Sequence, residues 1–375
     1  MTNTSDTMTT RGITRSAVHA FFLVLFSVLL VSCAPPEEKK VWNIVWPLPP
    51  DEPRIKFVEI LKSNKDVEGP AGLGQTLFGE EIVLNLVKPY GVAVDREGKV
   101  YVSDVGRVFV FDKKNKKLSF LGGEAGTGRL RTPIGIAIGA DGRVYVTDTA
   151  SDKIFVYNAK GNFVTAYGER EEFEAPSGLA IDEKRGRLYI ADAKKNNVRA
   201  YSFDGRLLLT IGSRGKEPGE FNFPTNVAVD SAGNLYVVDT GNFRVQIFDI
   251  EGKHLKSFGA VGDRPGNFSR PKGIAIDSED HIYVVDAAFQ NVQIFDREGQ
   301  LLLYFGEGGS DPGQFSVPAG ICIDSEDRIY VVDSLNSRVQ VFQYLGEKWK
   351  AGEAAHPVPE AQPKQEGEPK GVEKK

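Results

Sequence analysis

Short apolar runs separated by turn residues recur along the chain from residue 88 to residue 343. In one unit the runs are 227–230, 235–239, 245–249 and 255–258, and glycine, aspartate or asparagine stands between them. The third run alternates apolar and polar residues, which is typical of a strand with one less buried face. The first two runs are more continuously apolar, which is typical of strands covered on both faces. Each unit therefore predicts four short β-strands.

The unit repeats six times. Its Pro-x-Gly start, in which asparagine replaces the glycine once, lies about every 43 to 48 residues, at Pro89, Pro133, Pro176, Pro224, Pro271 and Pro318. Four-stranded repeats of this length are typical of β-propeller blades. The sixth unit has only three clear strands, and we expect residues 55–61 to supply the fourth and so remove the exposed sheet edges. The predicted fold class is all-β, a six-bladed β-propeller closed by an N-terminal strand.

The N-terminus predicts export and a lipid anchor. A positive segment with Arg11 and Arg15 precedes the apolar run 20–31, which has signal-peptide length. The run ends in Leu-Val-Ser-Cys, which resembles the bacterial lipobox and implies a lipidated Cys33 at the start of the mature protein. The alternative is an ordinary secretory signal. Residues 1–33 are thus interpreted as a lipoprotein signal peptide, and Ala34 after the cysteine favours the outer membrane of the cell envelope.

Three further segments follow from composition. Residues 34–54 are rich in proline and charge and predict an extended tether. Its Trp42 and Trp46 are expected either to pack on the folded body or to rest at the membrane interface. Residues 55–346 form the propeller, with an irregular insertion at 62–87. Residues 347–375 have balanced charge and little apolar content, and predict a disordered tail.

The charge and the cysteine and histidine content limit the kinds of binding or catalytic site that the chain can form. The chain has a formal net charge of −5, so no broad basic face indicates nucleic acid. The sequence contains no Cys-x-x-Cys pair, so nothing in it indicates a zinc knuckle or c-type haem. Cys322 stands where the other repeats have alanine, and we expect a buried, inert thiol. His254 and His281 stand in separate turns, where neither can pair as ligands or as base and nucleophile. We predict no cofactor and a monomeric body.

The repeats resemble the NHL repeat family. The most specific stretches are 258–277 (FGAVGDRPGNFSRPKGIAID), 305–324 (FGEGGSDPGQFSVPAGICID) and 239–248 (DTGNFRVQIF). The resemblance implies a six-bladed propeller, in agreement with the repeat count. The order of lipobox, proline-rich lead-in and six repeats is also similar to a group of uncharacterised bacterial propeller lipoproteins, for which no reaction is defined.

An aspartate ends the second strand of every repeat: Asp104, Asp148, Asp192, Asp239, Asp286 and Asp333. A ring of carboxylates can bind a hard cation such as calcium. Aspartate after a strand also accepts hydrogen bonds from the backbone N–H groups of the following turn. Because the residue occurs in all six repeats, we favour the structural role.

Binding residues are expected where the repeats differ, on the loops of one rim. The residue types enriched at interfaces, together with cationic and amide side chains on these loops, give the candidates Tyr90, Arg107, Lys195, Asn226, Phe243, Arg244, Lys272, Phe289 and Arg338. Arg244 and Arg338 lie within an Asn-x-Arg-Val run, so a structural role for them is an open alternative.

The sequence therefore predicts a membrane-anchored, non-enzymatic binding or scaffold lipoprotein. One rim of the propeller is expected to recognise an envelope protein or a glycan, and lipidated Cys33 to contact the membrane. The alternative function is a metal-dependent hydrolase or lyase that uses calcium or zinc in the central channel.

Overall fold

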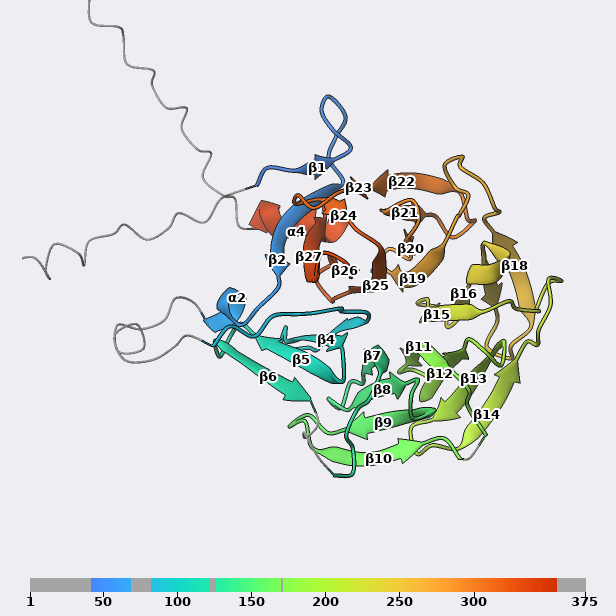
Figure 1. Cartoon of the computed structure of the whole chain (residues 1–375). Helices are drawn as coiled ribbons and strands as arrows, with labels where there is room; N and C mark the ends of the chain where they lie inside the picture. Colours follow the sequence, from blue (N-terminus) through green and yellow to red (C-terminus); the bar gives the residue numbers. More distant parts are fainter. Residues whose placement is uncertain (1–41, 69–81, 122–125, 170, 356–375) are drawn as a thin grey trace, which may run out of the picture. The chain divides into compact units, whose positions relative to one another are not determined.

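The computed structural model describes residues 42–68, 82–121, 126–169 and 171–355. Figure 1 shows six sheets arranged in a ring, each with its first strand innermost. The first five are β3 (Val92–Val94), β4 (Val100–Asp104), β5 (Arg107–Asp112), β6 (Lys117–Leu121); β7 (Pro133–Ile138), β8 (Val144–Asp148), β9 (Lys153–Tyr157), β10 (Phe163–Tyr167); β11 (Pro176–Asp182), β12 (Arg187–Asp192), β13 (Asn197–Ser202), β14 (Leu207–Ile211); β15 (Pro224–Val229), β16 (Leu235–Asp239), β17 (Arg244–Phe248), β18 (His254–Phe258); and β19 (Pro271–Ile276), β20 (Ile282–Asp286), β21 (Asn291–Phe295), β22 (Leu301–Phe305).

The sixth sheet joins both ends of the repeat region. Its strands are β25 (Pro318–Ile323), β26 (Arg328–Asp333), β27 (Arg338–Tyr344), β2 (Ile55–Leu61) and β1 (Val45–Trp46). Strand β2 pairs antiparallel with β27, with Phe57 opposite Phe342. This confirms the prediction that residues 55–61 supply the outer strand of the sixth blade. Small pieces complete the described chain: β23 (Glu307–Gly308), β24 (Gln314–Phe315), a 3-10 turn (Thr240–Asn242), α2 (Lys65–Glu68) and α4 (Glu347–Ala355).

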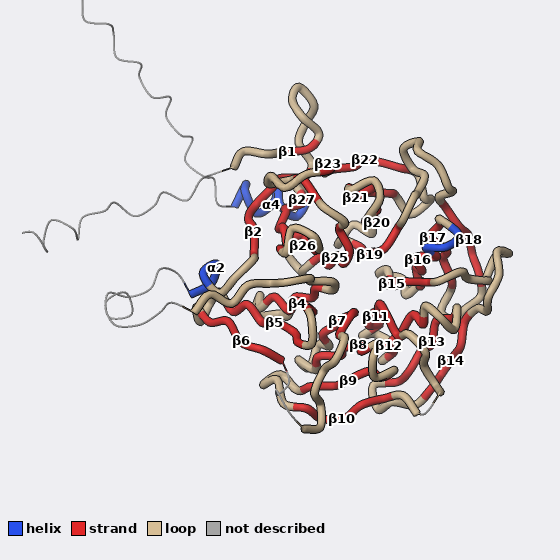
Figure 2. Tube along the Cα trace, in the orientation of Figure 1, coloured by secondary structure: helices blue, strands red, loops and turns tan. Residues whose placement is uncertain are grey.

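Burial in the second and outer strands follows the hydrophobic pattern. The third strands differ from the prediction of one less buried face, because even the polar Gln246 of β17 and Gln293 of β21 are buried. The second strand is buried along its whole length, as in β8 and β20, because neighbouring blades cover both of its faces. The outer strands are half exposed, as in β14 and β18. The apolar clusters lie between neighbouring blades; one of them joins Val238 and Val245 of the fourth blade to Val284 of the fifth. The core is therefore a ring of interfaces between blades, visible as the radial layers in Figure 2.

The N-terminal lead-in belongs partly to the propeller. Strand β1 extends the sixth sheet beyond β2, and the Trp46 ring lies 5.7 Å from Phe305 and 5.8 Å from Phe342 between ring centroids. The expectation that a tryptophan packs on the body is confirmed for Trp46. The predicted tether, residues 34–54, overlaps the body from residue 43 onward, and strand β1 within that overlap pairs with β2.

The segment after the last strand is helical where the sequence predicts a disordered tail from residue 347. Helix α4 begins where Glu279 Oε1 accepts the backbone N–H of Glu347 at 2.9 Å. Lys350 pairs with Glu52 at 3.0 Å. These partners lie far away in the sequence, so composition alone does not reveal them. Residues 356–375 of that tail, residues 69–81 of the insertion, and the predicted signal peptide lie outside the described residues.

Candidate functional site

The six blades present equivalent ends to the same face of the ring. In each sheet the start of the first strand pairs with the end of the second, as Pro271 pairs with Asp286. Hydrogen bonds join neighbouring blades at this end, such as Gly320 N–H to the Tyr90 carbonyl at 2.9 Å and Thr225 Oγ1 to the Lys272 carbonyl at 3.0 Å. We call this end the hub face. It carries the segments that enter each first strand and the turns 105–106, 149–152, 193–196, 240–243, 287–290 and 334–337.

The aspartates that end the second strands hold the hub-face loops in place by accepting hydrogen bonds from their backbone N–H groups. Asp148 is fully buried and accepts the backbone N–H groups of Thr132 (2.9 Å) and Ser151 (3.0 Å), which lie before and after it. Asp192 and Asp286 accept backbone N–H groups from the two equivalent segments of their blades. The structural role predicted for these aspartates is confirmed, and the loops that they hold are positioned by a rigid scaffold.

The guanidinium groups of Arg244 and Arg338 form hydrogen bonds with other groups of the same chain. Arg338 donates to Asp333 Oδ2 at 2.7 Å and to three backbone carbonyl groups of the loop before its blade, and its side chain is only 7% exposed. Arg244 donates to Asp239 Oδ2 at 2.9 Å and to two carbonyl groups of the equivalent loop. These contacts support the structural alternative for both residues, so neither guanidinium group is free to bind a partner.

Two of the predicted residues meet at the centre of the hub face. Lys272 Nζ, from the fifth blade, lies 5.4 Å from the ring centroid of Tyr90 in the first blade, which is within the range of a cation–π interaction. Both residues stand between the proline and the glycine that start their first strands. The sixth blade, between them, has the small buried Ala319 at this position. The Tyr90–Lys272 contact therefore spans one blade.

The other candidates are distributed around the same face. Asn226 is half-buried at the junction of the third and fourth blades, where a Cβ on Gly178 would collide with its amide. Lys195, Phe243 and Phe289 are half-buried in three different hub-face turns, and Phe243 packs against the cluster between the fourth and fifth blades. Among the described contacts, only that between Tyr90 and Lys272 joins two predicted residues.

Sequence reasoning missed an apolar cluster formed by Val87, Val105 and Leu335. These side chains are 66%, 63% and 61% exposed. The segments that carry them lie side by side, because Asp104 accepts the N–H groups of both valines at 2.6 Å, and Ser337 Oγ donates to the Val87 carbonyl at 2.7 Å. The available signal was the presence of aliphatic residues in variable turns, where polar residues are usual.

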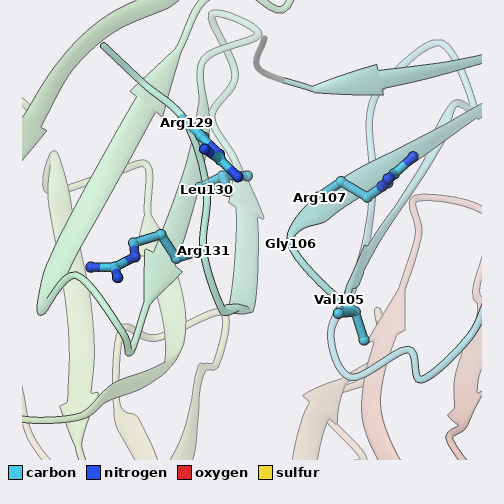
Figure 3. Close-up of a pocket in the computed structure, with 6 residues that line it drawn as sticks. All are labelled: Val105, Gly106, Arg107, Arg129, Leu130 and Arg131. Atoms are coloured by element: carbon cyan, nitrogen blue, oxygen red, sulfur yellow. The ribbon is translucent and has the colours of Figure 1, made fainter. Parts of the chain in front are cut away.

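A hollow of about 560 Å³ adjoins this cluster between the first and second blades. One wall is the turn 105–107 and the other is the loop 129–131 (Figure 3). The predicted residue Arg107 lies on the first wall, with its guanidinium carbon 5.0 Å from the Phe120 ring centroid. Arg129 and Arg131 come from the second wall. The site therefore combines aliphatic and cationic groups.

Other reactive side chains lie away from this site. Cys322 packs against the cluster between the sixth and first blades, and burial raises the pKa of its thiol well above the ordinary value, in agreement with an inert thiol. His254, in an outer strand, bonds Ser257 at 2.8 Å, and desolvation lowers its pKa. Among the described residues, no group of three or more His, Cys, Asp or Glu side chains could hold a metal ion.

His281 gives a pH-dependent contribution to stability on the opposite face. Its Nδ1 lies 3.0 Å from Asp277 Oδ2, and this hydrogen bond raises its pKa above 6.5. Because the folded state binds the proton more tightly, the stabilisation is complete below the unfolded pKa and is lost as pH rises through the raised folded pKa. We expect His281→Asn to lower the free energy of unfolding by about 1 kcal/mol more at about pH 5.5 than at about pH 9. Urea unfolding at the two pH values measures this, and equal losses would contradict it.

Comparisons with known proteins agree with this architecture. A family described as a 6-bladed beta-propeller matches residues 134–211, and the NHL repeat matches residues 221–248 and 315–342. The chain folds as a six-bladed β-propeller, and two of its segments match the NHL repeat. The second NHL match includes Arg338 and Gln340, whose side chains hold the loop before the sixth blade. No curated protein matches the chain.

Solved structures show similar propellers. Virginiamycin B lyase from Staphylococcus aureus is 18% identical with a TM-score of 0.52, over 69% of this chain and 97% of that chain. An auxiliary nutrient binding protein from Bacteroides thetaiotaomicron is 16% identical with a TM-score of 0.54, over 69% and 70%. A protein of unknown function from the same organism is 16% identical with a TM-score of 0.56, over 77% and 75%. At these identities the likeness shows the fold alone. Within the described residues, no helix combines the length and apolar character needed to cross a bilayer.

Proposed function

We propose that this propeller is a membrane-anchored, non-enzymatic binding lipoprotein whose hub face recognises a protein or a glycan of the cell envelope. The observation that carries the proposal is the exposed aliphatic cluster of Val87, Val105 and Leu335 on a face whose loops are held rigidly by buried aspartates. Exposed apolar groups on adjacent segments of a rigid surface favour a binding role. A binding role also agrees with the auxiliary nutrient binding proteins of similar fold.

The surroundings of the cluster support recognition on this face. Phe223 is 49% exposed on the segment that enters the fourth blade, and its backbone φ of 57° is unfavourable for a bulky residue. Its N–H is held by Asn196 Oδ1 at 2.9 Å, from the third blade. An aromatic ring that stays exposed in a strained backbone position is typical of functional loops. Aromatic and aliphatic groups would thus meet the partner at different points around the hub.

In-cell crosslinking tests the proposal. We expect a photoreactive amino acid at Val105, Leu335 or Phe223 to capture a discrete envelope molecule in intact cells. The matched control is Val164, which is 51% exposed on the outer strand β10, away from the hub face. Mass spectrometry of the captured species names the partner and separates a protein from a glycan. Capture from Val164 that equals capture from all three hub-face positions would contradict the proposal.

The lipid anchor is tested separately. We propose that lipidated Cys33 holds the protein on the outer membrane. More than one acyl chain gives stable anchoring at about 0.8 kcal/mol per buried methylene. We expect Cys33→Ala to leave a folded protein in the soluble fraction, with Cys322→Ala as the matched control that stays with the membrane. Membrane retention of the Cys33→Ala protein would refute the anchor.

The alternative enzymatic function has its own measurement. A hydrolase or lyase that uses the central channel would hold calcium or zinc there. Elemental analysis of protein purified from the native host without chelators decides between the two functions. One metal ion per chain, lost together with an activity on chelation, would replace the binding proposal with the enzymatic one.

A further inference from the structure

Three arginines flank the hollow beside the aliphatic cluster without an acidic partner among the described residues. Arg107, Arg129 and Arg131 are all exposed, and neither ion pairs nor side-chain hydrogen bonds within the described chain engage their guanidinium groups. Other arginines differ: Arg185, Arg297 and Arg328 each pair with an aspartate. The hollow is therefore a local concentration of positive charge on a chain whose net charge is −5.

The three arginines stand on both walls of the hollow, and one of them extends into the gap. Figure 3 shows Arg129 extending from the loop 129–131 toward the gap, while Arg107 and Arg131 extend outward from opposite walls. The backbone beneath Arg131 is fixed, because Asp148 accepts its N–H at 2.6 Å. Arg107 begins strand β5. The guanidinium groups are thus carried on fixed backbones with long side chains that can turn toward a ligand.

We infer that this hollow binds carboxylate groups of an acidic, aliphatic segment of a partner protein. The inference rests on the proposed recognition role of the hub face. Guanidinium groups match carboxylates in a two-bond, planar geometry. Val105 lines the hollow and also belongs to the aliphatic cluster, so one ligand can contact both.

The chemistry of the lining favours a protein segment over a glycan. The side chains that line the hollow are Val105, Arg107, Arg129, Leu130 and Arg131. Arginine offers only donors, so sugar hydroxyl groups would find no side-chain acceptor here. The lining also contains no aromatic ring on which a sugar ring can stack. Acidic and aliphatic side chains in one segment complement both the charge and the apolar surface.

A binding experiment with defined probes tests the inference. The purified mature chain is titrated with a fluorescent peptide of alternating leucine and glutamate, and with matched leucine–glutamine and leucine–lysine peptides. Polygalacturonate and anionic phospholipid vesicles form two further arms. We expect saturable binding of the leucine–glutamate peptide that weakens with added salt, because exposed charges are screened. Equal binding of the glutamine peptide, or tighter binding of polygalacturonate or vesicles, would overturn the inference.

Charge reversal assigns the binding to the hollow. We expect Arg129→Glu to weaken binding of the leucine–glutamate peptide at least tenfold. The double substitution Arg129→Glu and Arg131→Glu should abolish measurable binding. The matched control is Arg96→Glu, which makes the same charge change at an exposed arginine in the turn between β3 and β4 on the opposite face. Arg96→Glu should change the affinity less than twofold. An equal loss in Arg96→Glu and Arg129→Glu would show nonspecific attraction and overturn the inference.

The same variants separate this inference from the proposed function. If the photoreactive group at Leu335 captures the same partner with and without Arg129→Glu and Arg131→Glu, the hub face recognises its partner but the arginine hollow does not. If the leucine–glutamate peptide binds as expected but no hub-face position captures an envelope molecule, the proposed function fails and the anion site remains. If Leu335 captures a partner in the unchanged protein but not in the arginine variants, the result supports both the proposed function and the arginine hollow as a binding site.

Discussion

Replacing Asp333 by alanine is expected to lower the free energy of unfolding by about 3–5 kcal/mol, because it leaves a buried arginine without its counter-charge. Asp333 is fully buried, and its Oδ2 accepts Arg338 Nε at 2.7 Å and Asn336 Nδ2 at 2.8 Å. Its Oδ1 accepts the backbone N–H of Ser316 at 2.7 Å. Alanine would remove all of these bonds at one position. Urea unfolding of the purified mature chain measures the loss.

The first blade provides a matched control at the equivalent position. Asp104 is also buried, but within the described parts of the chain it accepts only backbone N–H groups, from residues 87, 88 and 105. Asp104→Ala should therefore cost about 1–3 kcal/mol, the usual cost of unsatisfied donors. Adding Arg338→Met to Asp333→Ala should recover part of the larger loss, because an apolar side chain replaces the unpaired charge. Equal losses in Asp104→Ala and Asp333→Ala would show that the arginine pair is not the cause.

The fold could be predicted from the sequence because each blade is specified locally. Alternating apolar runs, turn residues and the Pro-x-Gly start recur in register, and the missing strand of the sixth unit identified residues 55–61 as its complement. The parts that escaped prediction depend on contacts between distant residues. Strand β1 and the packing of Trp46 require Phe305 and Phe342. Composition alone therefore does not predict strand β1 or helix α4.

From the sequence, the candidate site could be predicted only as one face of the propeller and not residue by residue, for a similar reason. The sequence identified the variable turns and Arg107, but exposure depends on which groups find partners inside the fold. Arg338 and Arg107 have the same chemistry, yet one is bound by three carbonyl groups and an aspartate, while the other is exposed beside a hollow. Likewise Val87 and Leu335 lie 248 residues apart, and only ring closure brings them together on one surface.

The second large effect is expected at the point where the ring closes. A Cβ on Gly320 would collide with the Tyr90 carbonyl oxygen and lie 3.0 Å from Gly91 Cα. Both are backbone atoms of the first blade, so neither can turn aside as a side chain can. Gly320 N–H also donates to the Tyr90 carbonyl at 2.9 Å. We expect Gly320→Ala to lower the free energy of unfolding by about 2–3 kcal/mol through overpacking.

Gly352→Ala is the control for this substitution, because nothing lies within 4 Å of a Cβ there and the residue is in helix α4. It should be neutral or stabilise by up to about 1 kcal/mol, since glycine is unfavourable within a helix. Because Gly320 packs against the backbone that carries Tyr90, the change should also disturb the Tyr90–Lys272 contact on the hub face. Crosslinking from Leu335 should then fall in Gly320→Ala and not in Gly352→Ala. Unfolding curves that coincide for the two variants would mean that the sixth and first blades are not closed by this tight backbone contact.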